Sequence, residues 1–192
     1  MTGSHDAGAP RLFTVGHGTR TTEQLVAVLD DAGVGRVVDV RRYPGSRRHP
    51  HFARSALERS LSRHGMAYVW CGEELGGRRS NDAGTSRHRA LRVEAFRAFA
   101  DHMDTDVFRT AVDRLVSAAR RSAPSALMCA ETLWWRCHRR LISDALVLRG
   151  VRVDHLLQVG RSQPHHLHEA ARADGEGRPV YDVGQPASLD LG

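Results

Sequence analysis

The sequence predicts an α/β fold, in the form of a single domain with an open, mostly parallel sheet of about five strands and helices on both faces, as in Rossmann-like proteins. Short apolar runs alternate with amphipathic stretches, which is typical of a parallel sheet covered by helices. The 192 residues correspond to about one domain. The composition, 41% hydrophobic and 26% charged, is that of an ordinary globular protein.

The first half of the chain contains three predicted strands and two predicted helices. The first helix has Thr21 or Thr22 at its start and Gly33 directly after its end, which are typical capping residues. The second strand contains the run VVDV, which is apolar enough for burial on both faces. The predicted strands are 12–15, 36–40 and 66–70, and the predicted helices are 22–32 and 54–63.

The second half repeats this alternation after a long irregular segment. Residues 71–89 are rich in Gly, Arg, Ser and Asn, and loops of this length in compact domains are usually functional or mobile. Helices are predicted at 91–103, 107–121 and 137–149, and strands at 126–129 and 153–159.

The domain organisation follows from these elements. We expect a disordered N-terminal segment over 1–10, the α/β domain over 11–160, and a weakly ordered C-terminal tail over 161–192, where His, Gly, Asp and Pro are frequent. No apolar run approaches the ~20 residues of a membrane span, and the first ten residues lack the apolar core of a secretion signal. Three cysteines then indicate free thiols, and a cytoplasmic protein is expected.

The charge favours a polyanionic partner. The 28 basic residues outnumber 22 acidic ones, for a net charge of +6, and all 28 are arginine. The absence of lysine excludes a Walker-type phosphate loop and a lysine Schiff base. The N-terminal amine is then the one remaining amine nucleophile.

Chemically distinctive residues follow four predicted strands, at the point where each strand ends. In an open α/β sheet the carboxyl ends of the strands form the crevice where ligands bind, so we expect these residues to meet at one edge. They are His17, Gly18 and Thr19 after the first strand, Asp39, Arg41 and Arg42 after the second, Glu73 and Glu74 after the third, and Cys129 and Glu131 after the fourth.

The loop after the second strand is basic and rich in turn residues. Guanidinium groups suit phosphate oxygens, and Tyr43 or Phe52 offers a ring for base stacking. Asp39 has two interpretations: a structural partner of Arg41, or a catalytic carboxylate. The alternative for the whole loop is a solvated basic surface. The phosphate-binding candidates here are Arg41, Arg42, Ser46, Arg47 and Arg48.

Residues 127–146 hold a second group of candidates. Cys137 is predicted at a helix start, where a thiolate is stabilised, although a small thiol near a strand end is more often a packing residue. Zinc is disfavoured, because Cys129, Cys137 and His138 lack the paired C-x2-C spacing of structural sites. Trp134 and Trp135 either stack on an extruded base or cover the core.

The sequence GEELGGRR at 72–79 suggests close approach of the backbone to a ligand, with an acid beside it. We therefore add Glu74, Gly76 and Arg78 to the candidates. The run HHLH at 165–168 resembles a metal-binding tract, but its place in a polar tail indicates adventitious binding.

Several ordered motifs together resemble one bacterial family, the domain of unknown function 488. They are TVGHGTR, VVDVRRYPGSRR, ELGGRR, FRAFADHM, MCAE and CHRRLISDAL, and the resemblance covers residues 12–160. The sequence departs from the family pattern in the WW pair between Glu131 and Cys137 and in its His-rich tail. Some members of this family resemble DNA glycosylases for modified pyrimidines such as 5-hydroxymethyluracil.

The resemblance implies a DNA repair-type hydrolase that cuts the N-glycosidic bond of a modified pyrimidine, and the absence of lysine makes it monofunctional. We expect DNA with a flipped base as partner, no obligate protein partner, no membrane, no cofactor and no metal. The alternatives are a cysteine-dependent enzyme on a small phosphorylated or sulfur-bearing substrate, and a non-catalytic nucleic-acid-binding module. The expected catalytic residues are Glu131, Asp39, His17 and His138; phosphate contacts also include Arg78 and Arg139; base contacts come from Tyr43, Glu74, Gly76, Cys129, Trp134 and Trp135.

Overall fold

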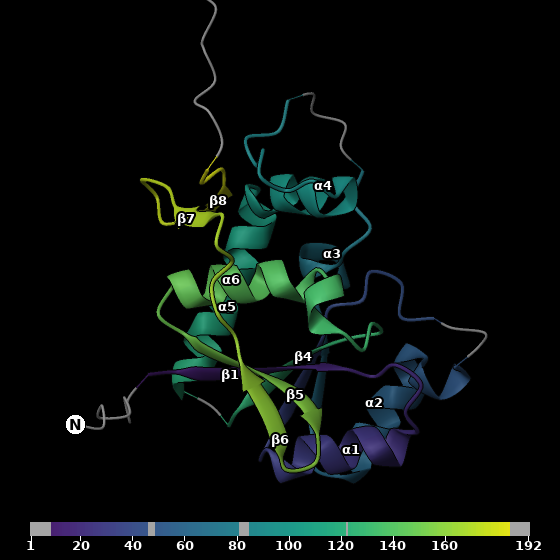
Figure 1. Ribbon diagram of the computed structural model, residues 1–192. Coiled ribbons are helices and arrows are strands. Elements are labelled where there is room, and N and C mark those ends of the chain that lie inside the picture. Colours follow the sequence, from purple (N-terminus) through teal and green to yellow (C-terminus); the bar gives the residue numbers. More distant parts are fainter. Residues whose placement is uncertain (1–8, 46–48, 81–84, 122, 185–192) are drawn as a thin grey trace, which may run out of the picture.

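The computed structural model describes residues 9–45, 49–80, 85–121 and 123–184, and it confirms the α/β class. A six-stranded sheet has the order β3-β2-β4-β1-β5-β6, and every neighbouring pair is parallel except β5 and β6 (Figure 1). The sheet thus has one strand more than the sequence predicts. Its strands are β1 (Arg11–Gly16), β2 (Arg36–Asp39), β3 (Ala67–Trp70), β4 (Ser125–Cys129), β5 (Arg152–Gln158) and β6 (Arg161–Pro164).

Helices cover both faces of the sheet, as predicted. On one face, α1 and α2 pack over an apolar cluster that includes Leu25 and Leu57; on the other, α4, α5 and α6 pack over a cluster that includes Phe99 and Leu141 (Figure 1). The helices are α1 (Thr22–Asp31), α2 (Arg54–Arg63), α3 (Gly72–Leu75), α4 (Glu94–Met103), α5 (Asp106–Arg121) and α6 (Arg139–Leu148), with short 3-10 turns η1 (Pro50–Phe52) and η2 (Trp134–Arg136).

Two helix starts lie later than the sequence predicts. The helix predicted from residue 91 begins at Glu94, because residues 91–93 are extended or bent. The helix predicted from Cys137 begins at Arg139, with His138 as the residue before it. Cys137 therefore lies in the turn that precedes the helix.

The order of the strands creates the crevice in which the site lies. Helices α1 and α2, which follow β1 and β2, cover one face, while α6, which follows β4, covers the other. Strand β4 lies between β2 and β1, so connections from neighbouring strands leave toward opposite faces. Such a switch point opens a cleft beyond the carboxyl ends of the strands.

Residues 161–184 are part of the folded structure, which corrects the expectation of a weakly ordered tail for this segment. Strand β6 extends the sheet, and β7 (Ala171–Ala173) pairs with β8 (Pro179–Tyr181) as a hairpin. The sequence of this segment is polar, yet Tyr181 is fully buried in the apolar cluster beside α6, where its hydroxyl donates to Asp144 at 2.8 Å. Residues 185–192 and most of the N-terminal segment expected to be disordered, residues 1–8, lie outside the described residues.

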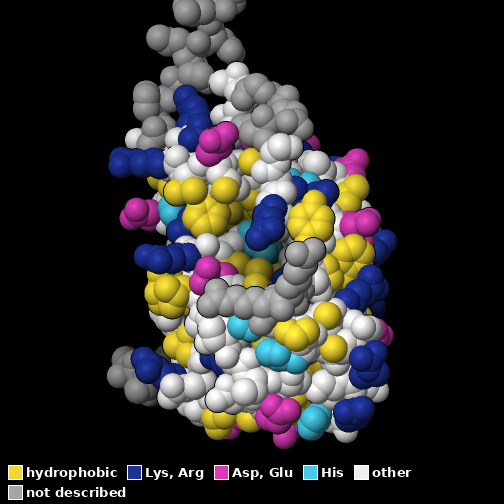
Figure 2. Space-filling model, turned by 90° about the vertical axis from the view of Figure 1, so that its right-hand side faces the viewer, with side chains coloured by type: hydrophobic (Ala, Val, Ile, Leu, Met, Phe, Trp, Pro, Cys, Tyr) yellow, Lys and Arg dark blue, Asp and Glu magenta, His cyan; other side chains and the backbone are white. Residues whose placement is uncertain are grey.

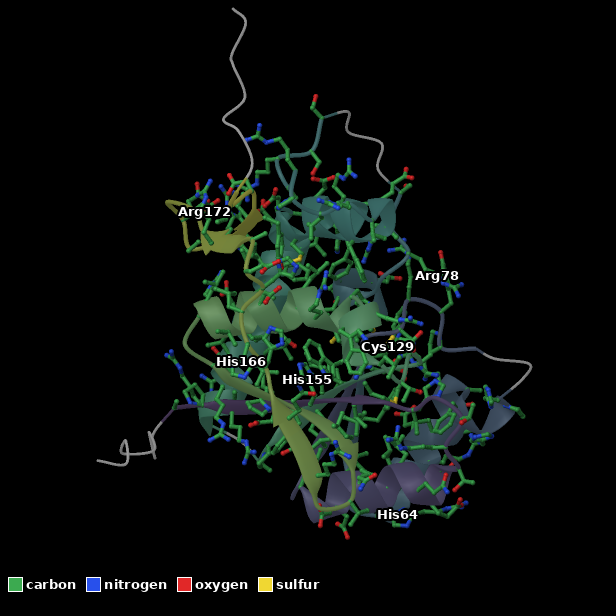
Figure 3. The ribbon with its side chains drawn as sticks, in the orientation of Figure 1. His64, Arg78, Cys129, His155, His166 and Arg172 are labelled. Carbon is green, nitrogen blue, oxygen red and sulfur yellow. The ribbon has the colours of Figure 1, made fainter. Side chains whose placement is uncertain are left out.

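A buried chain of hydrogen bonds ties this segment to the sheet. His165 joins Asp144 at 2.9 Å and the ring of His155 at 3.0 Å, and the other nitrogen of His155 lies 2.7 Å from the hydroxyl of Thr14. His155 lies between the sheet and α6 (Figure 3). Part of the HHLH run is therefore a core element. Across the described ranges, no helix is long and apolar enough to cross a lipid bilayer.

Candidate functional site

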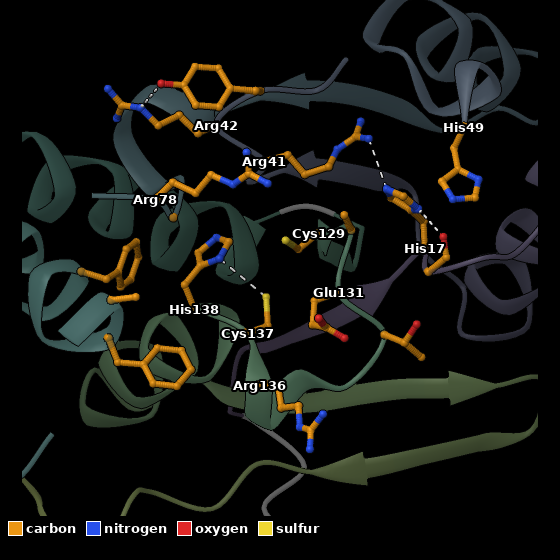
Figure 4. Close-up of a pocket in the computed structure, with 18 of the residues that line it drawn as sticks. His17, Arg41, Arg42, His49, Arg78, Cys129, Glu131, Arg136, Cys137 and His138 are labelled. Carbon is orange, nitrogen blue, oxygen red and sulfur yellow. Dashed lines mark hydrogen bonds between the residues drawn. The ribbon is translucent and has the colours of Figure 1, made fainter. Parts of the chain in front are cut away.

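A cavity of about 790 Å³ lies at the carboxyl ends of the strands, where the sequence predicts the ligand site. It is lined from the segments after β1, β2 and β4, from the loop after α3, and from α4 (Figure 4). The face that carries it is hollowed, with arginine side chains around the hollow (Figure 2). Of the predicted site residues, the lining includes His17, Arg41, Arg42, Tyr43, Arg78, Cys129, Glu131 and His138.

Asp39 lies outside the pocket lining and forms an ion pair with Arg41. Its side chain is fully buried and accepts from Nε of Arg41 at 2.9 Å, from Nη2 of Arg41 at 2.5 Å and from the hydroxyl of Tyr68 at 2.7 Å. The backbone N–H of Arg41 also donates to it. This geometry favours the structural interpretation of Asp39 that the sequence left open, because Asp39 does not line the pocket.

His17 forms a wall of the pocket with a neutral imidazole. Its Nδ1 lies 3.0 Å from the carbonyl of Gly18, which can only accept, so Nε2 accepts from Nη1 of Arg41 at 3.3 Å. Burial, followed by the nearby Arg41 charge, lowers the pKa of His17 to about 4. The ring stacks on Phe52. His17 therefore orients Arg41 and is not a proton donor at neutral pH.

Two cysteines and a histidine meet on the floor of the pocket; we call Cys129, Cys137 and His138 the thiol cluster. Their possible ligand atoms all lie within 4.8 Å of one another, and Sγ of Cys137 lies 3.6 Å from Nδ1 of His138. Nε2 of His138 donates to the carbonyl of Val40 at 3.1 Å, so Nδ1 faces the thiol. The three residues come from the end of β4 and from the turn before α6, so the fold brings them together without a C-x2-C spacing.

Arg139 contacts the thiol cluster through a hydrogen bond to Cys137. This predicted phosphate ligand is buried, and its Nε donates to Sγ of Cys137 at 3.3 Å while its other nitrogens reach Thr14 and the carbonyl of Glu131. It is therefore inaccessible to DNA phosphate, contrary to expectation. Arg139 is the first residue of α6 and belongs to the buried side of that helix.

The two thiols have opposite pKa shifts. Burial by itself raises the pKa of Cys137, but the hydrogen bond with Cys129 and the neighbouring His138 and Arg139 outweigh burial, so the pKa of Cys137 lies well below its usual value. The pKa of Cys129 is raised, first by its hydrogen bond to Cys137 and then by burial. Of the two hydrogen-bonded sulfurs, Cys137 is therefore the one whose surroundings favour the thiolate.

The arginine rim consists of Arg42, Arg78 and Arg136, which line the pocket from three different segments. Nη1 of Arg42 is buried and has no hydrogen-bond partner within the described part of the chain. Arg78 has a φ of 59°, the only positive value at a non-glycine residue among those described. Left-handed backbone at such a residue is strained and concentrates at functional sites.

Glu131 and Tyr43 supply the acid and the ring that the sequence assigns to the site. Glu131 is exposed to the pocket, and its side chain accepts from the backbone N–H of Leu133 at 3.3 Å, which holds it at the turn after β4 (Figure 4). Tyr43 is 65% exposed, so its ring is available for contact with a ligand.

Four predicted base contacts lie away from the pocket. Trp134 stacks on His155 at 4.0 Å and Trp135 contacts Trp134 edge-on. Glu74 does not line the pocket, and Gly76 is buried against Gly72 and Arg42, so its missing side chain serves packing. The predicted phosphate contacts Ser46, Arg47 and Arg48 lie outside the described residues.

Sequence reasoning missed several pocket residues. Phe96 and Phe99 come from α4, whose apolar side chains the sequence assigns to the core, and no local pattern places that helix at the carboxyl edge of the sheet. Arg136 and His49 were detectable, since each lies within or beside a segment already identified as basic.

A comparison with known families identifies the family of this chain. The model of the domain of unknown function DUF488 matches residues 21–146, which is more than half of the chain. The chain belongs to the DUF488 family. The DUF488 region contains all the pocket residues except His17 and Gly18. No match is found among curated proteins or among solved structures.

Proposed function

We propose that this DUF488 protein is a monofunctional DNA glycosylase, a hydrolase that cuts the N-glycosidic bond of a modified pyrimidine such as 5-hydroxymethyluracil or uracil. The described cysteines are free thiols, and the proposal places the protein in the cytoplasm with the DNA. The observation that carries it is a single pocket that combines an arginine rim with the carboxylate of Glu131.

The size and charge of the pocket suit a nucleotide flipped out of a duplex. Its volume of about 790 Å³ lies within the roughly 300–1,000 Å³ usual for small-molecule sites. The guanidinium groups of Arg42 and Arg78 line the pocket and can donate to phosphate oxygens. The exposed ring of Tyr43 can stack on a base.

Glu131 is the residue that we assign to the reaction. A water molecule attacks C1′ of the sugar, the bond from C1′ to the base nitrogen breaks, and its electron pair leaves with the base. Glu131 accepts the proton of the attacking water and stabilises the positive charge that develops on the sugar. The departing base then takes up a proton from solvent.

The leaving base is stabilised by arginine in this scheme. His17 is neutral and its nitrogens are engaged by Gly18 and Arg41, and Nε2 of His138 is engaged by Val40. The guanidinium of Arg41 lines the pocket and is the positive charge that we assign to the leaving base. Without lysine, the reaction ends at an abasic site.

The test uses duplex oligonucleotides with a single 5-hydroxymethyluracil or uracil. We expect strand cleavage only after alkali, which reveals abasic sites. Glu131→Gln lowers the single-turnover rate by at least about 100-fold. Glu58→Gln, on the exposed side of α2, removes the same charge and keeps the activity.

DNA affinity gives a second measurement. Arg42→Ala weakens binding to all sequences and makes the slope of log affinity against log salt shallower by about one, because one phosphate contact is lost. Arg59→Ala on α2 is the matched control and leaves the slope unchanged. Binding with no product on either base, with enzyme in excess, overturns the glycosylase proposal and supports a non-catalytic module.

A cysteine-dependent enzyme is the second candidate. Sγ of Cys137 lies 3.6 Å from Nδ1 of His138, and His138 is oriented by Val40, which is the arrangement of a nucleophile, its base and an orienting group. This candidate predicts turnover of a phosphorylated or sulfur-bearing small molecule, which iodoacetamide abolishes.

A further inference from the structure

The thiol cluster has the composition and the position of a metal site that is open to the pocket. Cys129 and Cys137 offer two sulfur atoms, His138 offers Nδ1, and all three residues line the pocket. Two sulfurs and one imidazole suit Zn²⁺ and disfavour Mg²⁺ and Ca²⁺, which take oxygen ligands. We propose that Cys129, Cys137 and His138 bind one Zn²⁺ ion whose fourth coordination position faces the pocket.

The separations of the three groups fit tetrahedral coordination. With Zn–S near 2.3 Å and Zn–N near 2.0–2.1 Å, tetrahedral angles put S and N about 3.6 Å apart and two S atoms about 3.8 Å apart. Sγ of Cys137 and Nδ1 of His138 are 3.6 Å apart. The largest separation in the cluster is within 4.8 Å, so a shift of about 1 Å closes the site.

Each ligand already has an outer partner that orients it. His138 donates its other ring N–H to the carbonyl of Val40, Cys137 accepts from Nε of Arg139, and Cys129 accepts from the backbone N–H of Glu131. Metal-binding histidines almost always donate their second N–H in this way, and such partners fix the ligand geometry.

The cluster suits a metal better than a single nucleophile. Cys137 is only 4% exposed, and its sulfur contacts Cys129, His138 and Arg139, so little of it faces a substrate. A mechanism in which Cys137 is the nucleophile also assigns no role to Cys129. Two thiolates balance the 2+ charge of the ion.

Three protein ligands with an open fourth position are the pattern of catalytic zinc sites, where a bound water has a pKa of about 7. Glu131 follows Cys129 by two residues and faces the same pocket. The inference goes beyond the proposed function. Metal binding is measured without DNA, so its outcome does not depend on whether the protein is a glycosylase.

The test uses the full chain, treated with EDTA and kept reduced, and titrated with Zn²⁺ and with Co²⁺. We expect one site per chain by calorimetry, and Co²⁺ to give the near-ultraviolet charge-transfer band of thiolate ligands. Cys137→Ser removes one of the two thiolate ligands, so it lowers the intensity of this band and weakens Zn²⁺ binding by more than about 100-fold, since even an outer partner contributes 10–100-fold. Cys71→Ser is the matched control and changes neither result, because Cys71 lies outside the cluster.

Adventitious binding by surface histidines gives no thiolate band, so it is separable from the proposed site. Should Cys137→Ser not fold, alkylation of the native chain decides: Zn²⁺ protects Cys129 and Cys137 from iodoacetamide, as read by mass spectrometry. A missing Co²⁺–thiolate band, equal losses in Cys71→Ser and Cys137→Ser, or alkylation at the same rate with and without Zn²⁺ overturns the inference. Rapid alkylation in both conditions favours the cysteine-dependent candidate instead.

Discussion

Replacement of Asp39 by Asn tests whether this carboxylate is structural. Asp39 is fully buried and Arg41 is 6% exposed, so Asp39→Asn leaves a guanidinium uncompensated in a low-dielectric site. Removing one partner of a buried ion pair costs about 3–5 kcal/mol. For a chain of this size each kcal/mol lowers Tm by about 2–4 °C, so we expect Tm to fall by roughly 6–20 °C.

The assay is urea unfolding at pH 7, with the midpoint compared at constant slope. The double variant Asp39→Asn/Arg41→Gln removes the unpaired charge, so its loss of stability is smaller than the sum of the two single losses. Glu131→Gln, at the exposed end of the same pocket, stays within about 0.5 kcal/mol of the native chain. An Asp39→Asn protein of native stability that has lost base excision would show that Asp39 is a catalytic carboxylate, and the structural interpretation would be wrong.

Three further predictions concern the core and the pocket floor. Burial, and then the charges of His165 and Arg139, lower the pKa of His155 to about 3. As the pH falls below about 6.5, the unfolded chain gains this proton and the folded chain does not, so the unfolding free energy falls by up to about 2 kcal/mol between pH 7 and pH 5. His155→Gln reduces this loss, as measured by urea titrations at the two pH values. Tyr181→Phe removes a hydrogen bond to a buried carboxylate and lowers the unfolding free energy by about 1.5–3 kcal/mol. Gly77→Ala places a Cβ 2.9 Å from Nδ1 of His138 and lowers the unfolding free energy by about 1–3 kcal/mol.

Matched variants control each of these predictions. His51→Gln changes an exposed ring, Tyr43→Phe an exposed hydroxyl, and Gly175→Ala a glycine with open space around it. Each control stays within about 0.5 kcal/mol of the native chain. Equal effects in a variant and its control would refute the corresponding prediction.

The sequence predicted much of the fold because the relevant signals are local. Apolar runs such as VVDV mark strands buried on both faces, and capping residues such as Thr21 mark helix ends. The convergence of the strand ends was also predictable, because the carboxyl ends of parallel strands share one edge of the sheet. His17, Arg41 and Glu131 meet at that edge as expected.

The later part of the chain was harder to predict, because its stability comes from distant contacts. Residues 165–168 are polar and look like a tail, yet His165 is buried through bonds to Asp144 and His155, which lie 21 and 10 residues away. Local hydropathy cannot show that a polar side chain has a buried partner.

By itself the sequence determined the α/β class, five of the six strands of the sheet and the edge at which the polar residues gather. Only the tertiary structure decided how each polar group is used: Asp39 and Arg139 are buried supports, while Cys129 and Cys137, eight residues apart, meet beside His138. The physical reason is that sequence periodicity specifies which face a side chain occupies, whereas its hydrogen-bond partner depends on how separate elements pack in three dimensions.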